Sequence, residues 1–308
     1  MRNLVCCCCL GWVLMGMNVP AFGQTPNAQV QSHQARQETT AERDAMGWPK
    51  DEDDEFGTLM ELKKTKPWYV MPYASAQGYW TSNVLLANNG EKGDSVFAET
   101  QGILTGYRLS PDWNLSAEYS YQLTRYSENP ALDVDSHTAG FSSSYQLPWN
   151  FQATMGINGL WLDSPDQKVQ LYRENNPYVA LSQTYSYLED RLAWSYGYQF
   201  DKKWTHPVGY EREEHSLFTG VSYAWLSNLI TQVGLRQNWQ FYDYRSPAQP
   251  VNGRQEWVSS VVAQAVWQPL SFLQVSAYGL AAYDNSVNAS FDYKLANAGG
   301  SLRFFWKF

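Results

Sequence analysis

The sequence predicts an all-β chain that forms a transmembrane, antiparallel, up-and-down β-barrel of about twelve strands. Aromatic residues make up 16% of the 308 residues and charged residues only 17%, compared with about 25% charged residues in ordinary globular chains. The mean hydropathy is nevertheless −0.47, which suits a barrel because half of each strand faces water in its lumen. Short turns also alternate with longer polar segments, as expected when the strands run up and down.

The composition excludes several other classes of protein. The formal net charge of −8 argues against nucleic-acid binding, which needs a basic surface. The chain contains no long apolar run of the kind that forms a membrane-spanning helix. Disorder throughout is excluded because disordered chains are poor in aromatic residues.

Residues 1–23 have the features of a secretory signal peptide. Arg2 supplies the positive end, an apolar core follows, and small residues precede a cleavage site near Gly23. All four cysteines lie within this segment. Cleavage therefore leaves a mature chain without cysteine, which excludes disulfides and cysteine metal sites from the exported protein.

Residues 24–66 are rich in Gln, Thr, Ala and charged residues and show little apolar periodicity. We expect a flexible acidic periplasmic arm there, whose most acidic part is the run Asp51, Glu52, Asp53, Asp54 and Glu55. The arm is a simple tether in one interpretation, and a plug for the lumen or a docking peptide in the other. From residue 67 the composition changes abruptly, so the barrel is predicted over residues 67–308.

The dominant sequence period in this second part is two, the period of a β-strand. In residues 150–162, Met155 and Ile157 share one face, and Gln152 and Asn158 share the other. The same alternation recurs at residues 113–124, 191–200, 229–241 and 257–268. The polar faces are rich in Gly, Ser, Asn and Gln, so we expect the uncharged apolar faces to contact lipid.

The connections between strands alternate in length, which supports a barrel more directly than any single strand does. Tight turns are predicted at residues 111–112, 147–148, 189–190, 227–228 and 269–270. Longer polar loops are predicted at residues 83–94, 126–136, 163–176, 201–214, 243–255 and 284–289. Closing such a sheet satisfies the backbone donors and acceptors that lipid cannot satisfy.

The last strand carries the most specific motif. Leu302, Phe304, Trp306 and Phe308 occupy alternate positions on one face. This ending resembles that of Gram-negative outer-membrane β-barrel proteins, the porin-like superfamily. The resemblance implies a bacterial outer-membrane location in contact with lipid and lipopolysaccharide, and recognition of the last strand by the barrel-assembly machinery. It also implies that the short turns are periplasmic and the long loops extracellular.

Few charged residues fall on the predicted lumen faces. They are Glu118, Arg191, Arg236 and Arg303, with Glu99 and Arg108 as further candidates. Glu118 and Arg236 belong to the third and ninth predicted strands, which lie across the lumen from one another in a barrel of twelve. Such residues either form a constriction that selects solutes by charge or pair in the polar core of a closed barrel.

Catalytic and cofactor motifs are absent from the sequence. It contains no phosphate-binding loop, no dinucleotide-binding fingerprint and no zinc-protease motif, and we expect no cofactor and no metal. His137 and His215 fall at strand ends, where an exposed imidazole is the simplest interpretation. A serine from a neighbouring strand could still approach His215, so a lipid-modifying barrel enzyme stays open.

The function predicted first is a passive, porin-like channel for small polar solutes, which would cross a lumen lined by Gly, Ser and Gln. The second is a sealed structural or interaction barrel whose loops make surface contacts and whose arm holds a periplasmic partner. The lipid-modifying enzyme is the third.

Overall fold

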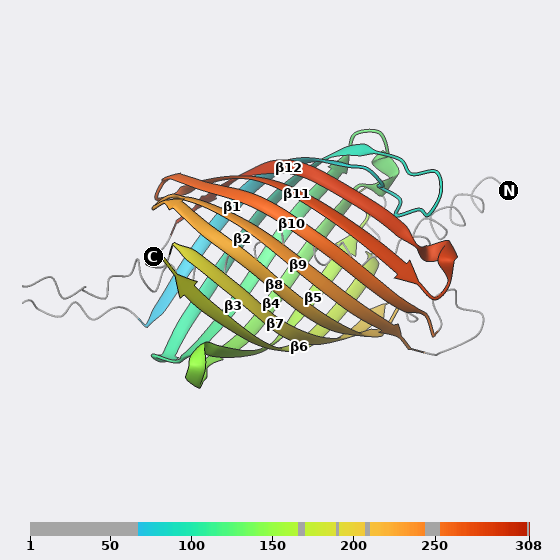
Figure 1. Cartoon of the computed structure of the whole chain (residues 1–308). Helices are drawn as coiled ribbons and strands as arrows, with labels where there is room; N and C mark the ends of the chain where they lie inside the picture. The colour runs from blue at the N-terminus through green and yellow to red at the C-terminus, as the bar shows by residue number, and fades with distance from the viewer. Residues whose placement is uncertain (1–66, 166–169, 189–190, 207–209, 244–252, 307) are drawn as a thin grey trace, which may run out of the picture. The chain divides into compact units, whose positions relative to one another are not determined.

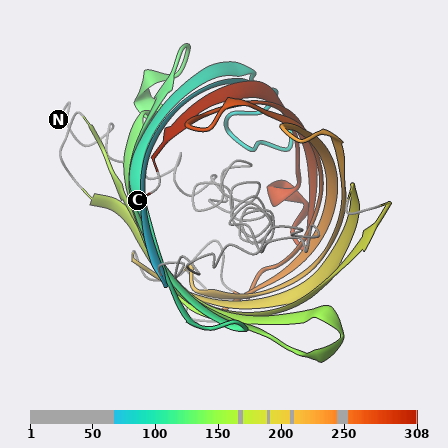
Figure 2. The same ribbon diagram turned by 90° about the vertical axis from the view of Figure 1, so that its left-hand side faces the viewer.

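The structure is a computed structural model that describes residues 67–165, 170–188, 191–206, 210–243, 253–306 and 308. These residues form one closed barrel of twelve antiparallel strands, in which strands adjacent in sequence pair and β1 pairs with β12 (Figure 1, Figure 2). The predicted all-β, up-and-down barrel is therefore confirmed. The predicted signal peptide and acidic arm, including the run from Asp51 to Glu55, lie outside the described residues.

The strands are long and of similar length. They are β1 (Trp68–Thr81), β2 (Asp94–Ser110), β3 (Trp113–Tyr126), β4 (Val134–Gln146), β5 (Phe151–Asp163), β6 (Gln170–Tyr187), β7 (Leu192–His206), β8 (Arg212–Leu226), β9 (Leu229–Tyr242), β10 (Gln255–Leu270), β11 (Leu273–Ser286) and β12 (Tyr293–Phe305). Three short 3-10 helices lie in connections: η1 (Pro130–Leu132), η2 (Pro148–Asn150) and η3 (Ala289–Phe291). No helix among the described residues is long and apolar enough to cross a membrane.

Alternation along each strand decides which side chains face outward. In β5, Met155 and Ile157 are 62% and 47% exposed, whereas Leu160 and Leu162 are buried on the inner face. Exposed tryptophans lie toward the strand ends and in the connections: Trp68, Trp80, Trp113, Trp149, Trp194, Trp204, Trp225 and Trp267. An apolar outer surface bordered by such rings is the arrangement that a bilayer favours.

Glycines on the inner face make room for tyrosines of the neighbouring strand. A Cβ atom at Gly102 would lie 2.5 Å from Cζ of Tyr73, and one at Gly106 would lie 2.1 Å from Cε1 of Tyr69. The rings therefore pack against the barrel wall where the neighbouring strand has no side chain.

Short connections lie at one end of the barrel, the turn end, and longer ones at the other, the loop end. Three of the five predicted tight turns fall in the corresponding connections, for example between Leu226 of β8 and Leu229 of β9, and the one predicted at residues 189–190 lies outside the described residues. The fifth was predicted at residues 269–270, but β10 continues to Leu270 and the turn follows at residues 271–272. An irregular register between Trp267 and Leu270 accounts for the difference.

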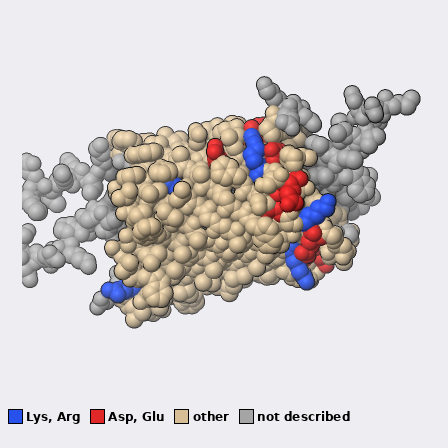
Figure 3. Space-filling model, turned by 90° about the horizontal axis from the view of Figure 1, so that it is seen from above, with Lys and Arg blue, Asp and Glu red and all other residues tan. Residues whose placement is uncertain are grey.

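Two segments predicted as loops are mostly strand. The predicted loop at residues 163–176 is shortened because β6 begins at Gln170, and the one at residues 201–214 because β7 continues to His206 and β8 begins at Arg212. Charged side chains gather at the loop end on the face shown in Figure 3, and the rest of that face carries only isolated charges. The strands extend through this charged region because alternate polar residues find partners inside the barrel.

Candidate functional site: the barrel lumen

The inner wall formed by β3, β4 and β5 is polar and accessible to solvent. Glu118 and Asn158 face inward by the alternation of their strands, and both side chains are exposed. The Oγ atoms of Ser116 and Ser142 lie 2.7 Å apart on neighbouring strands. Small hydroxyl and amide groups therefore line this side, and they can hydrogen-bond a passing polar molecule or water.

Two of the predicted lumen residues are connected through Tyr73. The hydroxyl of Tyr73 on β1 donates a hydrogen bond of 2.6 Å to Oε1 of Glu118 on β3. Cζ of Arg303 on β12 lies 4.4 Å from the centroid of the Tyr73 ring, within range of a cation–π contact. One aromatic ring thus lies between an acidic and a basic side chain on the inner wall.

The third predicted residue, Arg236 on β9, is fixed by hydrogen bonds within its own part of the wall. It donates hydrogen bonds of 3.0 Å to Oδ1 of Asn238 and 3.0 Å to Oγ of Ser216 on β8. In the closed strand order, β3 and β9 are six steps apart in either direction. Glu118 and Arg236 consequently project from opposing walls.

The fourth residue, Arg191, was expected on the lumen face of a strand, and this placement requires correction. It lies in the connection before β7, which begins at Leu192, and its side chain is exposed. Its backbone N–H donates to the carbonyl of Leu188, as in a turn. Alternation predicts whether a side chain faces inward only while the residue lies within a strand. Arg191 precedes the first residue of β7, so it belongs to the turn end. The further candidate Glu99 lies on the outward face of β2, because it is paired in register with Ala76 and Leu123.

The largest group of inward charges was missed in the sequence. Glu214 on β8 accepts contacts from Nζ of Lys203 at 3.0 Å and from Nε of Arg212 at 2.6 Å. Both cations also lie 3.8 Å from the carboxylate of Glu174 on β6, which accepts a hydrogen bond of 2.8 Å from the hydroxyl of Tyr172. All four charged side chains are buried.

This network continues onto the next strands. Cζ of Arg254 lies 4.4 Å from the ring centroids of both Tyr242 and Phe291, and its Nε lies 2.9 Å from Oε1 of Glu256. Asp284 on β11 is fully buried near this pair. We call the seven charged residues the loop-end charge cluster: Glu174, Lys203, Arg212, Glu214, Arg254, Glu256 and Asp284.

A sequence signal for this cluster existed. Its strand residues alternate with one another or with neighbouring polar residues, as in Arg212 and Glu214, Glu174 and Asn176, or Lys203 and Thr205. These short polar alternations lie inside charge-rich segments. Such segments are predicted as loops when the residues between the charged ones do not form a clear apolar face.

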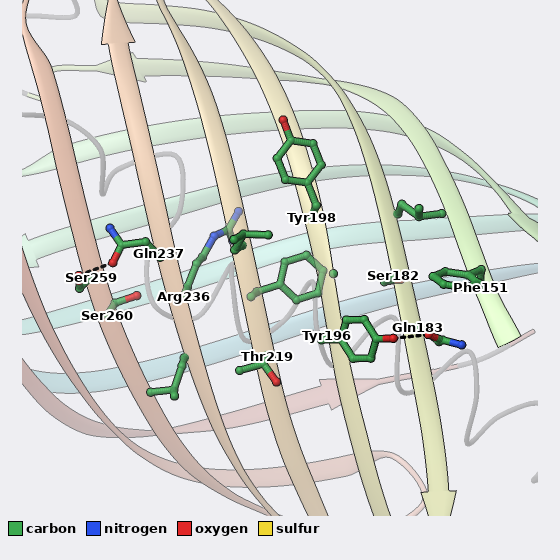
Figure 4. A pocket seen from close by; sticks show the side chains of 15 residues that line it. Phe151, Ser182, Gln183, Tyr196, Tyr198, Thr219, Arg236, Gln237, Ser259 and Ser260 are labelled. Atoms are coloured by element: carbon green, nitrogen blue, oxygen red, sulfur yellow. Dashed lines mark hydrogen bonds between the residues drawn. The ribbon is translucent and has the colours of Figure 1, made fainter. Parts of the chain in front are cut away.

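A hollow in the wall of β6 to β10 is lined by side chains from both faces of the sheet. It has a volume of about 650 Å³, and its lining includes Leu181, Tyr198 and Leu217 from the outward face as well as Arg236, Phe218 and Ser260 from the inward face. Figure 4 shows its polar contacts, between Tyr196 and Gln183 and between Ser259 and Gln237. Because Arg236 also faces the lumen, this hollow belongs to the wall around Arg236 and is not a site separate from the lumen.

The histidines singled out in the sequence also face outward. Nδ1 of His215 lies 2.6 Å from the hydroxyl of Tyr198, and Nδ1 of His137 lies 2.8 Å from that of Tyr119. Ser216, next to His215, faces inward and donates to Oδ1 of Asn238. Among the described residues, the hydrogen-bond partner of His215 is therefore a tyrosine and not a serine that could act as a nucleophile. Among the described residues no group of three acidic, histidine or cysteine side chains is placed to hold a metal ion.

The residues of the predicted assembly motif lie on the outward face. Leu302, Phe304, Trp306 and Phe308 are 46%, 39%, 50% and 67% exposed. The backbone N–H of Phe308 donates to the carbonyl of Val70 at 3.0 Å, which continues the pairing between the last and first strands.

Comparisons with known proteins bear on the fold. No protein-family model matches the chain, and no curated protein sequence matches it either. The structure is similar to that of an outer-membrane channel from Pseudomonas putida F1, with a TM-score of 0.51 and 12% identity over 82% of this chain and 100% of that chain. This chain has the fold of an outer-membrane β-barrel.

Two other solved barrels align less closely. The beta domain of the Bordetella autotransporter BrkA has a TM-score of 0.46 and 10% identity over 77% of this chain and 99% of that chain. The NanC porin has a TM-score of 0.43 and 12% identity over 75% of this chain and 98% of that chain.

Proposed function

We propose that this protein is a passive outer-membrane channel for small polar solutes, with no catalytic role. The observation that carries the proposal is the inner wall of β3 to β5, where Glu118 and Asn158 face inward and are exposed. The similarity to a Pseudomonas putida barrel described as an outer-membrane channel supports it. In this proposal the signal peptide is removed near Gly23, the turn end is periplasmic and the loop end is extracellular.

Selectivity in this proposal comes from the opposing charges of the lumen. Glu118 is the exposed acid on one wall, and Arg236 is the hydrogen-bonded base on the other. A solute that passes between them is selected by its charge and its hydrogen-bonding groups. The tyrosine rings packed over Gly102 and Gly106 stay against the wall and leave the polar groups accessible.

The test is single-channel recording of the purified, refolded mature protein in a planar bilayer. We expect stepwise openings. Glu118→Gln should lower the preference for cations, measured as a shift of the reversal potential in a salt gradient, and Arg236→Gln should shift it the other way. Lys294→Gln, which removes an exposed charge from the outward face of β12, is the matched control and should leave it unchanged.

The sealed barrel is the second candidate, and one observation favours it. The loop-end charge cluster is buried, and its acidic and basic side chains form ion pairs with one another, as expected of a polar core rather than of a solute path. A protein that is correctly folded and silent in the bilayer, with or without residues 24–66, would refute the channel. The periplasmic partner of the arm would then be sought by crosslinking.

A further inference from the structure

A smaller hollow lies on the outward surface of β6 and β7, close to the loop end. Its volume is about 520 Å³. It is lined by Gln170, Arg173, Asn175, Trp204, Thr205 and His206. None of these residues faces the centre of the lumen except Thr205, whose neighbours Trp204 and His206 point outward. The hollow is therefore separate from the proposed channel.

The chemistry of the lining is that of an anion site. Arg173 on β6 and His206 on β7 are directly paired in register, so their side chains share one face. The lining also includes two side-chain amides and the indole of Trp204, and it includes no carboxylate. A guanidinium beside further N–H donors matches the oxygen atoms of a phosphate group.

Arg173 is also held in place for such a contact. Its Cζ lies 5.9 Å from the centroid of the Trp161 ring on β5. A cation at this distance is attracted to the face of the ring, which restricts where the guanidinium lies. The side chain is exposed, so a ligand reaches it without displacing a described residue.

The position of the hollow indicates where the phosphate comes from. Further along β6, Val179 and Leu181 are exposed on the same outward face, in the apolar surface that a bilayer would cover. Trp204 is 51% exposed at the border between this surface and the loop end. Aromatic rings at such a border lie at the level of lipid headgroups, so a phosphate bound by Arg173 would belong to a lipid whose acyl chains cover Val179 and Leu181.

We propose that this hollow binds the phosphate of an anionic lipid headgroup in the membrane leaflet on the loop side. Arg173 and His206 donate to the phosphate oxygens, and Trp204 packs against the uncharged part of the headgroup. The inference rests on the membrane location that the proposed function includes. It does not need an open lumen, so lipid binding and conductance are tested separately.

The experiment is native mass spectrometry of the purified full-length mature protein in zwitterionic detergent, titrated with diphosphoryl lipid A. The double variant Arg173→Gln/His206→Gln should retain the lipid about tenfold less tightly or worse, the equivalent of losing a charge-assisted hydrogen bond. Lys294→Gln removes one exposed outward cation from the other side of the barrel and should bind like the wild type. Arg173→Lys keeps the charge without the planar fork and should bind with intermediate affinity.

Several outcomes would overturn the proposal. The double variant and the wild type could bind equally, or Lys294→Gln could lose as much affinity, which would indicate general attraction to the charged end. Dephosphorylated lipid A could bind as tightly as the phosphorylated form. Competition by inorganic phosphate at equal concentration would assign the site to free phosphate instead. Heat-modifiable mobility on gels verifies that each variant is folded before it is titrated.

Discussion

Replacing Glu214 with Gln should strongly destabilise the barrel. The Glu214 side chain is buried and lies 3.0 Å from Nζ of Lys203 and 2.6 Å from Nε of Arg212. Its neutralisation leaves two buried cations without their nearest carboxylate, since Glu174 lies 3.8 Å from each. Removing one partner of a buried ion pair costs about 3–5 kcal/mol. Asp201 is paired directly opposite Glu214, so Glu214→Gln also removes a repulsion between two acidic side chains. The expected loss in free energy of unfolding is therefore at the lower end of this range, about 3 kcal/mol.

The neighbouring residue provides the control. Glu213 is on the outward face, is 47% exposed, and lies 3.3 Å from Nζ of Lys202. Glu213→Gln should therefore cost less than about 1 kcal/mol, as for other exposed pairs. The assay is reversible unfolding by urea in detergent micelles, followed by tryptophan fluorescence. Equal losses in free energy of unfolding for the two variants would refute the assignment of Glu214 to a buried network.

Three further predictions concern other parts of the barrel. Gly102→Val should displace the ring of Tyr73 into the lumen and lower the single-channel conductance, with a stability loss of about 1–3 kcal/mol; unchanged conductance would contradict the packing of Tyr73 over Gly102. Phe308→Ser should reduce the amount of folded barrel in the outer membrane, measured by heat-modifiable mobility after expression, if the last strand is the assembly signal; an unchanged yield would exclude this role. Deletion of residues 24–66 should leave conductance unchanged if the arm is a tether, and an increase would identify a plug.

The architecture could be predicted because it depends on a pattern repeated along the whole chain. Period-two alternation and short turns recur in each unit, so an error in one turn, such as the one placed at residues 269–270, does not alter the strand number. The inward positions of Glu118, Arg236 and Arg303 followed from the same alternation. Their partners Tyr73 and Ser216 could not be derived, because contacts between strands depend on the register that the whole barrel adopts.

The loop-end charge cluster was missed for a related reason, although its residues alternate in the sequence. Lys203, Arg212 and Glu214 are strongly charged, and an isolated charge-rich segment is normally solvated and irregular. Only the closed barrel shows that residues from β6, β7 and β8 face one another and satisfy each other's charge. The prediction for Arg191 was wrong for the opposite reason. The polar alternation of β7 extends in sequence to Arg191, but the strand begins only at Leu192.

The seam between β1 and β12 has a consequence for the order of events during biogenesis. Strands adjacent in sequence are joined by short connections and can pair locally, but β1 must find β12, which brings together residues as distant in sequence as Tyr73 and Phe305. Until then the sheet has two unpaired edges, which are sites of aggregation. Contacts that join such distant segments also form slowly. The interval before closure is therefore when the chain is most prone to aggregate, and a fragment that lacks β12 would keep its edges unpaired.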